Sequence, residues 1–457
     1  MPFTTEEDAI TYLFRSLRTV RGANPAIERL PDEQTRDVSP TRALLRESGL
    51  QEAASPREYA VITGSKGKGS TTAIMAKLLQ HLGHTVGMIT SPHLVSFRER
   101  IRVNGRAISE ADLVRIVNEL QPFIDRIEAT LPPGRYFSPQ GLFLAIALRW
   151  FDELHVNAAV LEVGRGGRYD DVAVVPNKLS LFTPILIEHP YQLGPTLDRI
   201  AWHKAGIIKP YSYAYSVPQP PEVLDVIRAE AEMQHAEFAW IAPMDMGEYV
   251  RESARGIVMN LGRYGEVELS LKGRYQVENA ALAVQGAGNL HGRLAGISHG
   301  SPEYVAAIRA GLNDVRWAGR MEKLSDSPAV WLDGATTVVA AESMIETLQG
   351  QLTDPVIAVI ATPDDRDYAG VYRVMSRVSQ HLILTETDIN PKIHFPEPET
   401  ALAAARQYRE ATFIPRFAPA LAQAKALAGA DGTVLLAVAQ PIVGEAMLIA
   451  GYRFDQI

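Results

Sequence analysis

A glycine-rich loop between an apolar segment and an amphipathic segment restricts the fold of this chain more than any other feature. Residues 63–70 read TGSKGKGS and directly follow the apolar residues 59–62. Glycine lets a backbone approach an anion closely, and a helix that begins after such a loop points its free N–H groups and positive dipole end at the anion. We therefore expect a strand, a phosphate-binding loop and a helix. The alternative is a plain glycine-rich surface turn.

The side chains of this loop suit a nucleotide. Lys68 supplies a mobile positive charge, and Ser70 or Thr71 supplies a hydroxyl group for a magnesium ion. The loop departs from the standard phosphate-binding spacing, because Gly69 separates the lysine from the hydroxyl residue. This third glycine narrows the set of families to which the loop can belong.

The length and composition of the chain narrow its class further. With 457 residues, of which 46% are hydrophobic, the chain exceeds one ordinary domain, so we expect two. The 45 basic and 53 acidic residues leave a net charge of -8 without blocks of one sign, which argues against nucleic acid or a membrane surface as a partner. The lack of cysteine excludes disulfides and thiolate catalysis. The acidic start and the lack of a long apolar run predict a cytoplasmic protein.

Apolar strands and amphipathic helices alternate through the first two thirds of the chain. Such alternation predicts a mainly parallel sheet covered by helices. The predicted strands span residues 60–63, 86–90, 158–163 and 179–183, and the predicted helices span residues 4–18, 71–82, 142–154 and 196–205.

The alternation restarts near residue 314. Strands are predicted over residues 330–332, 356–360, 382–385 and 434–437, with alanine-rich helical stretches between them. We therefore expect an α/β protein in two parts. A P-loop domain with a mainly parallel sheet is predicted over residues 1–314, and a smaller Rossmann-like α/β domain over residues 315–457.

Further motifs follow the loop in an order that is typical of one family. Residues 90–105 read TSPHLVSFRERIRVNG, residues 161–168 read LEVGRGGR and residues 204–209 read KAGIIK. Gly319 and Arg320, and then an Asp-Gly-Ala sequence from residue 333, continue the series. With these motifs the chain resembles the folylpolyglutamate synthase and dihydrofolate synthase branch of the Mur ligase superfamily.

The resemblance implies an ATP-dependent ligase with a central ligase domain and a C-terminal ligase domain. Such an enzyme phosphorylates a carboxylate, and the acyl phosphate then reacts with the amino group of an amino acid or another amine, which releases ADP and phosphate. The enzyme must cradle the phosphates, neutralise the charge on the transferred group and position the acceptor. Its partners are then small-molecule carboxylates and amines, and many relatives are monomeric.

The resemblance also implies that the nucleotide lies between the two domains. Lys68 becomes an expected catalytic residue as well as a phosphate contact, because its charge neutralises the transferred group. Lys66 stands where the family usually has asparagine, so it is either an extra phosphate contact or a solvated surface lysine. The implied ATP contacts are Gly64, Ser65, Lys66, Gly67, Lys68, Gly69, Ser70, Thr71, Asn279, Arg320 and Asp333.

Four residues are expected to hold Mg²⁺, at one or two sites. They are Ser70, Ser91, Glu162 and His189, of which Glu162 and His189 are also expected catalytic residues. Glu162 ends a predicted buried strand, and a carboxylate there faces the crevice where ligands bind. The alternative for Glu162 is an ion pair with a neighbouring arginine, and for His189 a buried structural histidine.

Lys204 is the fourth expected catalytic residue. It lies on a predicted helix among apolar residues, where burial lowers the pKa of a lysine. The resemblance implies that Lys204 reacts with carbon dioxide to form a carbamate, an anion that helps to hold the metal. An unmodified lysine paired with a phosphate or carboxylate is the equal alternative.

Substrate contacts are expected from Ser91, Pro92, His93 and Asp170. The chain departs from the family near these positions. Thr336 and Thr337 follow the Asp-Gly-Ala sequence where histidine and asparagine are usual, and Glu188 replaces the usual aspartate.

Three classes of function remain open on these grounds. The first is a ligase with altered substrates, within which an authentic dihydrofolate or folylpolyglutamate synthase is the alternative. The second is a nucleotide-binding pseudoenzyme that has lost turnover through the changes at residues 336 and 337. The third, a general P-loop ATPase or kinase, is disfavoured by Gly69 and by the sequence of residues 204–206.

Overall fold

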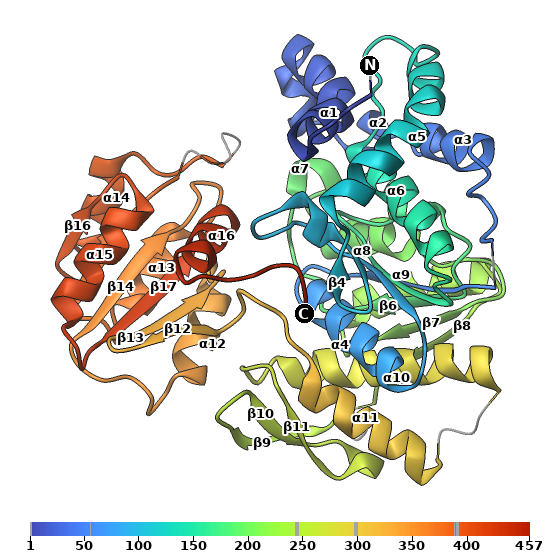
Figure 1. Ribbon diagram of the computed structural model, residues 1–457. Helices are drawn as coiled ribbons and strands as arrows, with labels where there is room; N and C mark the ends of the chain where they lie inside the picture. The colour runs from blue at the N-terminus through green and yellow to red at the C-terminus, as the bar shows by residue number, and fades with distance from the viewer. Residues whose placement is uncertain (1, 55, 243–245, 297–299, 388, 390–392) are drawn as a thin grey trace.

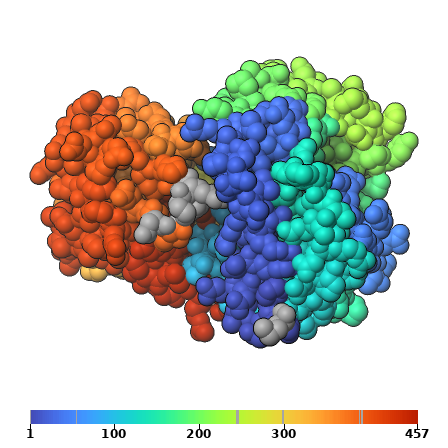
Figure 2. Space-filling model, turned by 90° about the horizontal axis from the view of Figure 1, so that it is seen from above, coloured from blue at the N-terminus to red at the C-terminus, as the bar shows by residue number. Residues whose placement is uncertain are grey.

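The structure, a computed structural model, describes residues 2–54, 56–242, 246–296, 300–387, 389 and 393–457. The chain forms a large lobe around an eight-stranded sheet, with a three-stranded sheet at its base, and a smaller lobe around a six-stranded sheet (Figure 1). Seen from above, the orange and red C-terminal lobe lies beside the large lobe (Figure 2). This arrangement confirms the predicted α/β fold with a mainly parallel sheet followed by a smaller α/β unit.

The glycine-rich loop leaves the middle of the large sheet. Six neighbouring strands, β2, β5, β1, β6, β7 and β8, run parallel to one another. At the edge next to β2, β3 pairs antiparallel with β2, and β4 pairs antiparallel with β3. Strand β1 lies between β5 and β6, so the loop at its carboxyl end emerges in the central crevice. In spatial order the strands are β4 (Arg106–Ala107), β3 (Ile101–Val103), β2 (Val86–Ile89), β5 (Ala158–Glu162), β1 (Glu58–Thr63), β6 (Leu179–Phe182), β7 (Tyr213–Ser216) and β8 (Glu237–Trp240).

Helices cover both faces of this sheet. The α-helices of the large lobe are α1 (Glu6–Ala23), α2 (Asp32–Thr35), α3 (Ser39–Glu47), α4 (Lys68–His81), α5 (Glu110–Glu128), α6 (Pro139–Glu153), α7 (Pro190–Leu193), α8 (Leu197–Ala205), α9 (Pro221–Met233), α10 (Gln276–Ala295) and α11 (Pro302–Asp314). Short 3-10 helices are η1 (Pro25–Arg29), η2 (Phe97–Arg100), η3 (Asp171–Val174) and η5 (Gly262–Tyr264).

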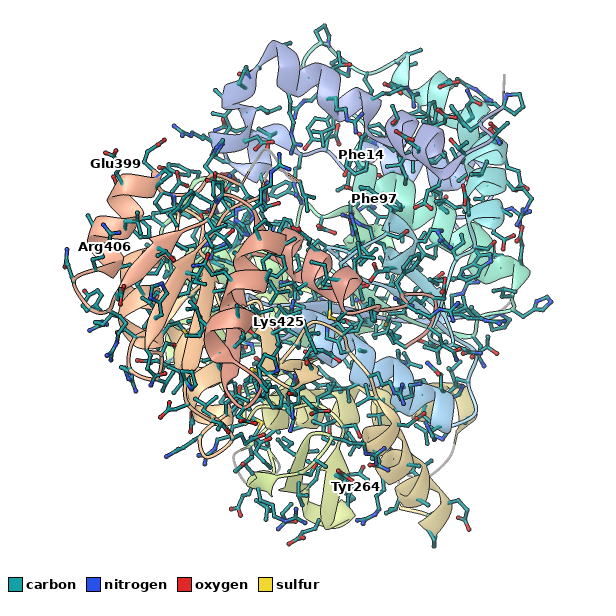
Figure 3. The ribbon with its side chains drawn as sticks, turned by 60° about the vertical axis from the view of Figure 1, so that its left-hand side comes forward. Phe14, Phe97, Tyr264, Glu399, Arg406 and Lys425 are labelled. Carbon is teal, nitrogen blue, oxygen red and sulfur yellow. The ribbon has the colours of Figure 1, made fainter. Side chains whose placement is uncertain are left out.

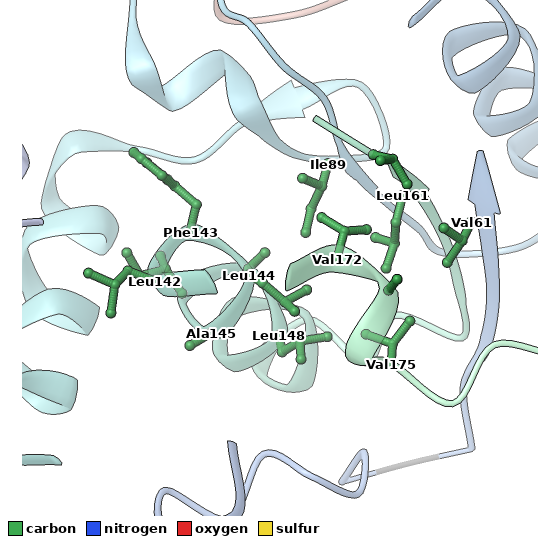
Figure 4. Close-up of a cluster of buried hydrophobic side chains, with 14 of the residues drawn as sticks. Val61, Ile89, Leu142, Phe143, Leu144, Ala145, Leu148, Leu161, Val172 and Val175 are labelled. Atoms are coloured by element: carbon green, nitrogen blue, oxygen red, sulfur yellow. The ribbon is translucent and has the colours of Figure 1, made fainter. Parts of the chain in front are cut away.

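Successive residues of β1 point to opposite faces of the sheet and so enter different cores. Val61 packs with Ile89, Leu161 and the α6 residues Leu144 and Leu148 on one face (Figure 4). Ala60 and Ile62, which precede and follow Val61, enter a second core formed with α4 and α10 on the other face. Burial on both faces explains why the central strands read as uninterrupted apolar runs.

The three-stranded antiparallel sheet at the base was absent from the sequence-based expectations. Its strands are short, and charged residues occupy their outward positions, so the apolar signal is weak. Ile257 and Met259 nevertheless point into the core beneath α10 and α11. The strands, in spatial order, are β11 (Glu266–Leu269), β10 (Ile257–Asn260) and β9 (Glu248–Glu252).

The smaller lobe repeats the parallel design. Along β14, Ala358 and Ile360 enter one core, and Ile357 and Val359 enter the core on the other face. Its strands are β12 (Glu322–Asp326), β13 (Ala329–Asp333), β17 (Thr433–Val438), β14 (Val356–Ala361), β15 (His381–Leu384) and β16 (Ala411–Phe413), and only β12 is antiparallel. Its helices are α12 (Val338–Thr347), α13 (Tyr368–Met375), α14 (Pro398–Ala405), α15 (Phe417–Ala428) and α16 (Gln440–Ile449).

The boundaries of some elements differ from the expected ones. Helix α4 begins at Lys68 rather than at residue 71, because Gly67 caps it in a left-handed conformation and the chain turns helical at once. Helix α1 is longer than expected and is capped by Thr5. Residues 315–321 connect α11 to β12, and the division of the chain after residue 314 stays a prediction. None of the helices in the described part of the chain combines the length and apolarity needed to cross a bilayer.

Candidate active site

The glycine-rich loop is held by one hydrogen bond to the chain after β6 and by another across the loop itself. The Ser65 N–H donates to the carbonyl of Pro184 just after β6, at 2.7 Å. Lys68 Nζ donates to the Gly64 carbonyl at 2.9 Å, across the loop. Gly64 and Gly67 have φ of 145° and 84°, which side chains rarely allow. The loop therefore holds a shape that leaves the N-terminus of α4 open toward the crevice.

Helix α10 supports the loop from below. Thr71 Oγ1 donates to Asn279 Oδ1 at 3.3 Å, and Gln276 Nε2 donates to Ser70 Oγ at 3.5 Å. Asn279 in turn donates to Gln276 at 2.8 Å. A Cβ on Gly67 would lie 2.2 Å from Asn279 Oδ1, so the loop and α10 approach as closely as glycine permits. Asn279 is thus a direct support of the loop as well as an expected nucleotide contact.

A cavity of about 570 Å³ lies between the two lobes, in front of the loop. The following expected site residues line it: Ser65, Lys66, Gly67, Lys68, Gly69, Ser70, Ser91, Pro92, His93, Glu162, Asn279, Arg320 and Asp333. Gly64, Thr71, Asp170, His189 and Lys204 are not among its lining residues. The structure thus brings most of the expected residues, from both lobes, to a single cavity.

Three aromatic residues that line this cavity, Tyr275, Trp317 and Tyr452, were not among the site residues expected from the sequence. Trp317 lies in the connection between the lobes and packs on the loop, where a Cβ on Gly69 would come within 3.0 Å of its ring. The sequence signal that could have identified Trp317 is its position two residues before the Gly-Arg motif. The third glycine of the loop therefore makes room for this ring.

Positive side chains from both lobes face the cavity. Lys66 and Lys68 come from the loop, and Arg320 and Arg366 come from the smaller lobe. Lys66 keeps exposed surface, but desolvation beside the cavity and the positive charge of Arg366 lower its pKa. Acidic side chains, among them Glu162, Glu188 and Asp333, line the same cavity and partly compensate these cations, and a nucleotide polyphosphate is a further anion that they suit.

Glu162 is a buried carboxylate at the end of β5. Burial raises its pKa to about 7, against the lowering effect of Lys68. Glu162 Oε2 accepts the Ser91 N–H at 3.0 Å. The alternative of an ion pair with a neighbouring arginine is wrong, because Arg165 pairs with Asp32 and Arg168 pairs with Glu230. Glu162 is therefore oriented for a ligand in the cavity.

The donor set around Glu162 fits Mg²⁺. In the part of the chain that the structure describes, no three histidine or acidic side chains are grouped closely enough to hold a metal by themselves. Mg²⁺ commonly takes one or two carboxylates and completes its shell with water and substrate phosphate. Glu162 with the hydroxyls of Ser91 and Ser70, which line the same cavity, supplies such oxygen ligands.

His189 is less directly placed than Glu162. It precedes α7 in a left-handed conformation with φ of 48°, it is exposed, and its carbonyl accepts the N–H groups of Gln192 and Leu193. The alternative of a buried structural histidine is therefore wrong. Its role as a metal ligand stays a prediction.

Lys204 is buried directly behind the loop. Its Nζ donates to the Gly64 carbonyl and to Glu188 Oε1, each at 2.8 Å. Burial lowers the pKa of Lys204 to about 8. Burial by itself would raise the pKa of Glu188, but the positive charges of Lys204 and Lys68 lower it to about 2. Lys204 thus links the phosphate loop to the lining residue Glu188.

Asp170 serves the local structure. Its carboxylate accepts the N–H of Val172 at 3.0 Å, which caps η3, and lies 3.4 Å from the Arg36 guanidinium. The side chain is 1% exposed. Its expected contact with substrate stays a prediction.

Comparisons with known proteins agree with this geometry. The family model for the Mur ligase, glutamate ligase domain matches residues 319–439. The chain is 31% identical over 394 residues to the dihydrofolate synthase/folylpolyglutamate synthase of Bacillus subtilis, covering 84% of this chain and 86% of the relative. It is 30% identical over 382 residues to the dihydrofolate synthase/folylpolyglutamate synthase of Mycobacterium tuberculosis, covering 79% and 77%.

Solved structures show the same architecture. The folylpolyglutamate synthase of Mycobacterium tuberculosis, complexed with ADP and AMPPCP, superposes with a TM-score of 0.79 at 26% identity, covering 92% of this chain and 97% of that chain. The folylpolyglutamate synthase of Thermotoga maritima superposes with a TM-score of 0.74 at 25% identity, covering 92% and 94%. The similarity therefore extends over both lobes.

Proposed function

Because the chain belongs to the folylpolyglutamate synthase and dihydrofolate synthase family of ATP-dependent ligases, we propose that it joins glutamate to the carboxylate of a folate or folate precursor. The chain is an ADP-forming acid–amino acid ligase that binds ATP. The expectation of a substrate other than folate is not supported, and the alternative of an authentic folate ligase is closer to the similarities found. The inter-lobe cavity with the phosphate loop, Glu162 and cations from both lobes supports the ATP-dependent ligase reaction, and the similarity to dihydrofolate and folylpolyglutamate synthases supports folate and glutamate as its substrates.

The residues divide the reaction between them. The N–H groups of the loop and Lys68 hold the ATP phosphates, and Arg320 reaches them from the smaller lobe. The carboxylate substrate takes the γ-phosphoryl group, and the acyl phosphate then loses phosphate when the amine attacks. The 91–94 segment, whose Ser91 N–H donates to Glu162, would orient the acyl group. Walls from both lobes exclude water, which would otherwise hydrolyse the acyl phosphate.

Mg²⁺ is the second proposed cofactor. Glu162, Ser91 and Ser70 would hold it, and when bound it neutralises charge on the phosphates. The proposals that His189 joins Glu162 and Ser91 in a second magnesium site, that the protein is a monomer and that it is cytoplasmic stay predictions.

Lys204 is proposed to carry a carbamate. Its lowered pKa leaves more neutral amine than an exposed lysine has, and only the neutral nitrogen attacks carbon dioxide, losing a proton as the N–C bond forms. We expect a carbamate signal from this residue in the ¹³C NMR spectrum of the protein equilibrated with ¹³C-bicarbonate, and no such signal from Lys204→Met. A spectrum without that signal in the wild-type protein would establish the unmodified ammonium that pairs with Glu188.

The substrate is tested by phosphate release. We expect ADP and phosphate to form only when ATP, Mg²⁺, glutamate and either dihydropteroate or a tetrahydrofolate are all present, with the glutamylated product identified by mass spectrometry. A panel of other carboxylates and amines is the control. Turnover with another pair only would overturn the folate proposal, and nucleotide binding without any turnover would favour the pseudoenzyme.

A further inference from the structure

A short segment of the smaller lobe lies on the large lobe. Residues 452–457, here called the strap, follow α16 and cross to the edge strand β4 (Figure 1, red). The Ala107 N–H donates to the Asp455 carbonyl at 2.9 Å, and the Ile457 N–H donates to the Gly105 carbonyl at 3.1 Å. Gln456 forms an antiparallel bridge with Arg106. The strap therefore pairs with the open edge of the large sheet.

Side chains strengthen this contact. The Arg98 guanidinium lies 4.8 Å from the ring centre of Phe454. Tyr452 lies close to the buried Arg102, whose positive charge it influences, and both residues line the inter-lobe cavity. Lys77 Nζ donates to the Ile457 carbonyl at 3.4 Å. The strap thus contacts β3, β4 and α4 of the large lobe.

The strap reaches the site through the segment of residues 91–100. This segment carries Ser91 at one end, and its other end leads directly into β3, which the strap contacts. Its Phe97 is fixed on the large-lobe side between Phe14 and Phe143, at ring distances of 5.3 and 5.8 Å (Figure 3 shows Phe14 and Phe97). Helix α16 packs on its opposite side.

Gly444 of α16 makes that contact. A Cβ on Gly444 would lie 1.9 Å from the Leu94 carbonyl oxygen, so the helix and the segment approach as closely as glycine permits. Within the segment, Glu99 accepts the N–H groups of Val95 and Ser96 at 2.7 and 2.8 Å. The segment is therefore a rigid turn held between the large lobe on one side and α16 with the strap on the other.

We infer that the strap and Gly444 are positioning elements of the ligase: by docking the smaller lobe on β4 and on Leu94, they hold the 91–100 segment against Glu162. The kcat/KM measurement rests on the proposed function, whereas the hydrogen-exchange measurement does not. The phosphate loop is fixed by β6 and α10, whereas the strap contacts the side of the large lobe that carries the 91–100 segment, so we expect its loss to weaken use of the acyl substrate more than nucleotide binding, to which Arg320 of the smaller lobe also contributes.

The test compares the full chain with a variant lacking residues 452–457. We expect kcat/KM for the carboxylate substrate to fall about tenfold or more, since an ångström of misplacement can cost about a hundredfold, while the ADP dissociation constant rises by a smaller factor. Amide hydrogen exchange of residues 95–107 should accelerate in the variant, a readout that does not need the substrate to be known. A synthetic peptide of the strap sequence YRFDQI should restore part of the activity in trans.

If the deletion impairs folding, point variants of the full chain test the same contacts. Gly444→Ala should reproduce the loss in kcat/KM, whereas Gly22→Ala, a helical glycine with open space around it, should not. Phe454→Ala and Tyr452→Phe in the full chain should each accelerate exchange of residues 95–107. Unchanged exchange together with unchanged kcat/KM in the deletion variant would overturn the inference. Failure of the wild-type protein to use folates would instead overturn the proposed function and leave the exchange result decisive for the strap.

Discussion

Replacing Glu162 with glutamine should reduce ligase turnover by about 10³-fold, the scale of losing one major electrostatic contact to the transferred group. Glutamine keeps the acceptor for the Ser91 N–H but cannot neutralise Mg²⁺. ADP affinity should change little, because the loop and the cations of both lobes remain. The measurement is phosphate release at saturating substrates, with ADP binding followed by calorimetry. Glu252→Gln is the control, since Glu252 has a pKa raised by burial but lies outside the cavity.

Turnover of Glu162→Gln within a few-fold of the wild type would show that the metal assignment is wrong. Loss of ADP binding in parallel with turnover would show instead that Glu162 supports the phosphate loop. The two outcomes differ because the carboxylate and the loop come from separate strands, β5 and β1.

The same substitution should also change how stability depends on pH. Burial raises the pKa of Glu162 to about 7, whereas an unfolded glutamate titrates near 4.3. Between these values the folded protein holds a proton that the unfolded chain has lost, so this group's contribution to stability falls as pH rises. Glutamine does not ionise, so the variant does not lose this stability as pH rises. The variant should therefore gain up to about 3 kcal/mol over the wild type between about pH 5 and pH 8 in urea unfolding without ligands.

The features that the sequence predicted best are those encoded locally. Strand β1 and the loop after it were predictable because a strand buried on both faces reads as one apolar run, and because the glycines at 64 and 67 adopt conformations that few other residues tolerate. Glu162 was predicted to face the crevice in the same way, because it is a carboxylate at the end of an apolar strand. The resemblance then supplied the partner residues in the smaller lobe.

The features that escaped prediction depend on contacts between distant residues. Lys204 reaches the Gly64 carbonyl across 140 positions of the chain, and the glutamate at 188 takes part in the same contact. The strap on β4 and the ring of Trp317 on Gly69 likewise leave no periodic signal in the sequence. The cap that Asp170 forms on η3 and its contact with Arg36 were likewise not predicted, and its expected contact with substrate stays a prediction.

Substituting Gly67 with alanine should weaken nucleotide binding. The residue has φ of 84°, and its new Cβ would lie 2.2 Å from Asn279 Oδ1, a side chain that is itself hydrogen-bonded to Thr71 and Gln276. The loop and α10 must then separate, which moves the N–H groups that face the phosphates. We expect ADP to bind at least about tenfold more weakly, a loss of roughly 1.4 kcal/mol, measured by calorimetry.

Gly134→Ala separates the steric effect from the backbone effect. Gly134 has φ of 79°, but no atom lies within 4 Å of the position that an alanine methyl group would take, so it bears the same left-handed penalty of about 1–2 kcal/mol without a clash. Both variants should lose a similar amount of stability from backbone strain, but only Gly67→Ala should lose ADP affinity. Adding Asn279→Ala to Gly67→Ala should cost less than the sum of the single effects, because the colliding atoms are gone. Strictly additive losses would show that Asn279 is not what the new methyl group meets.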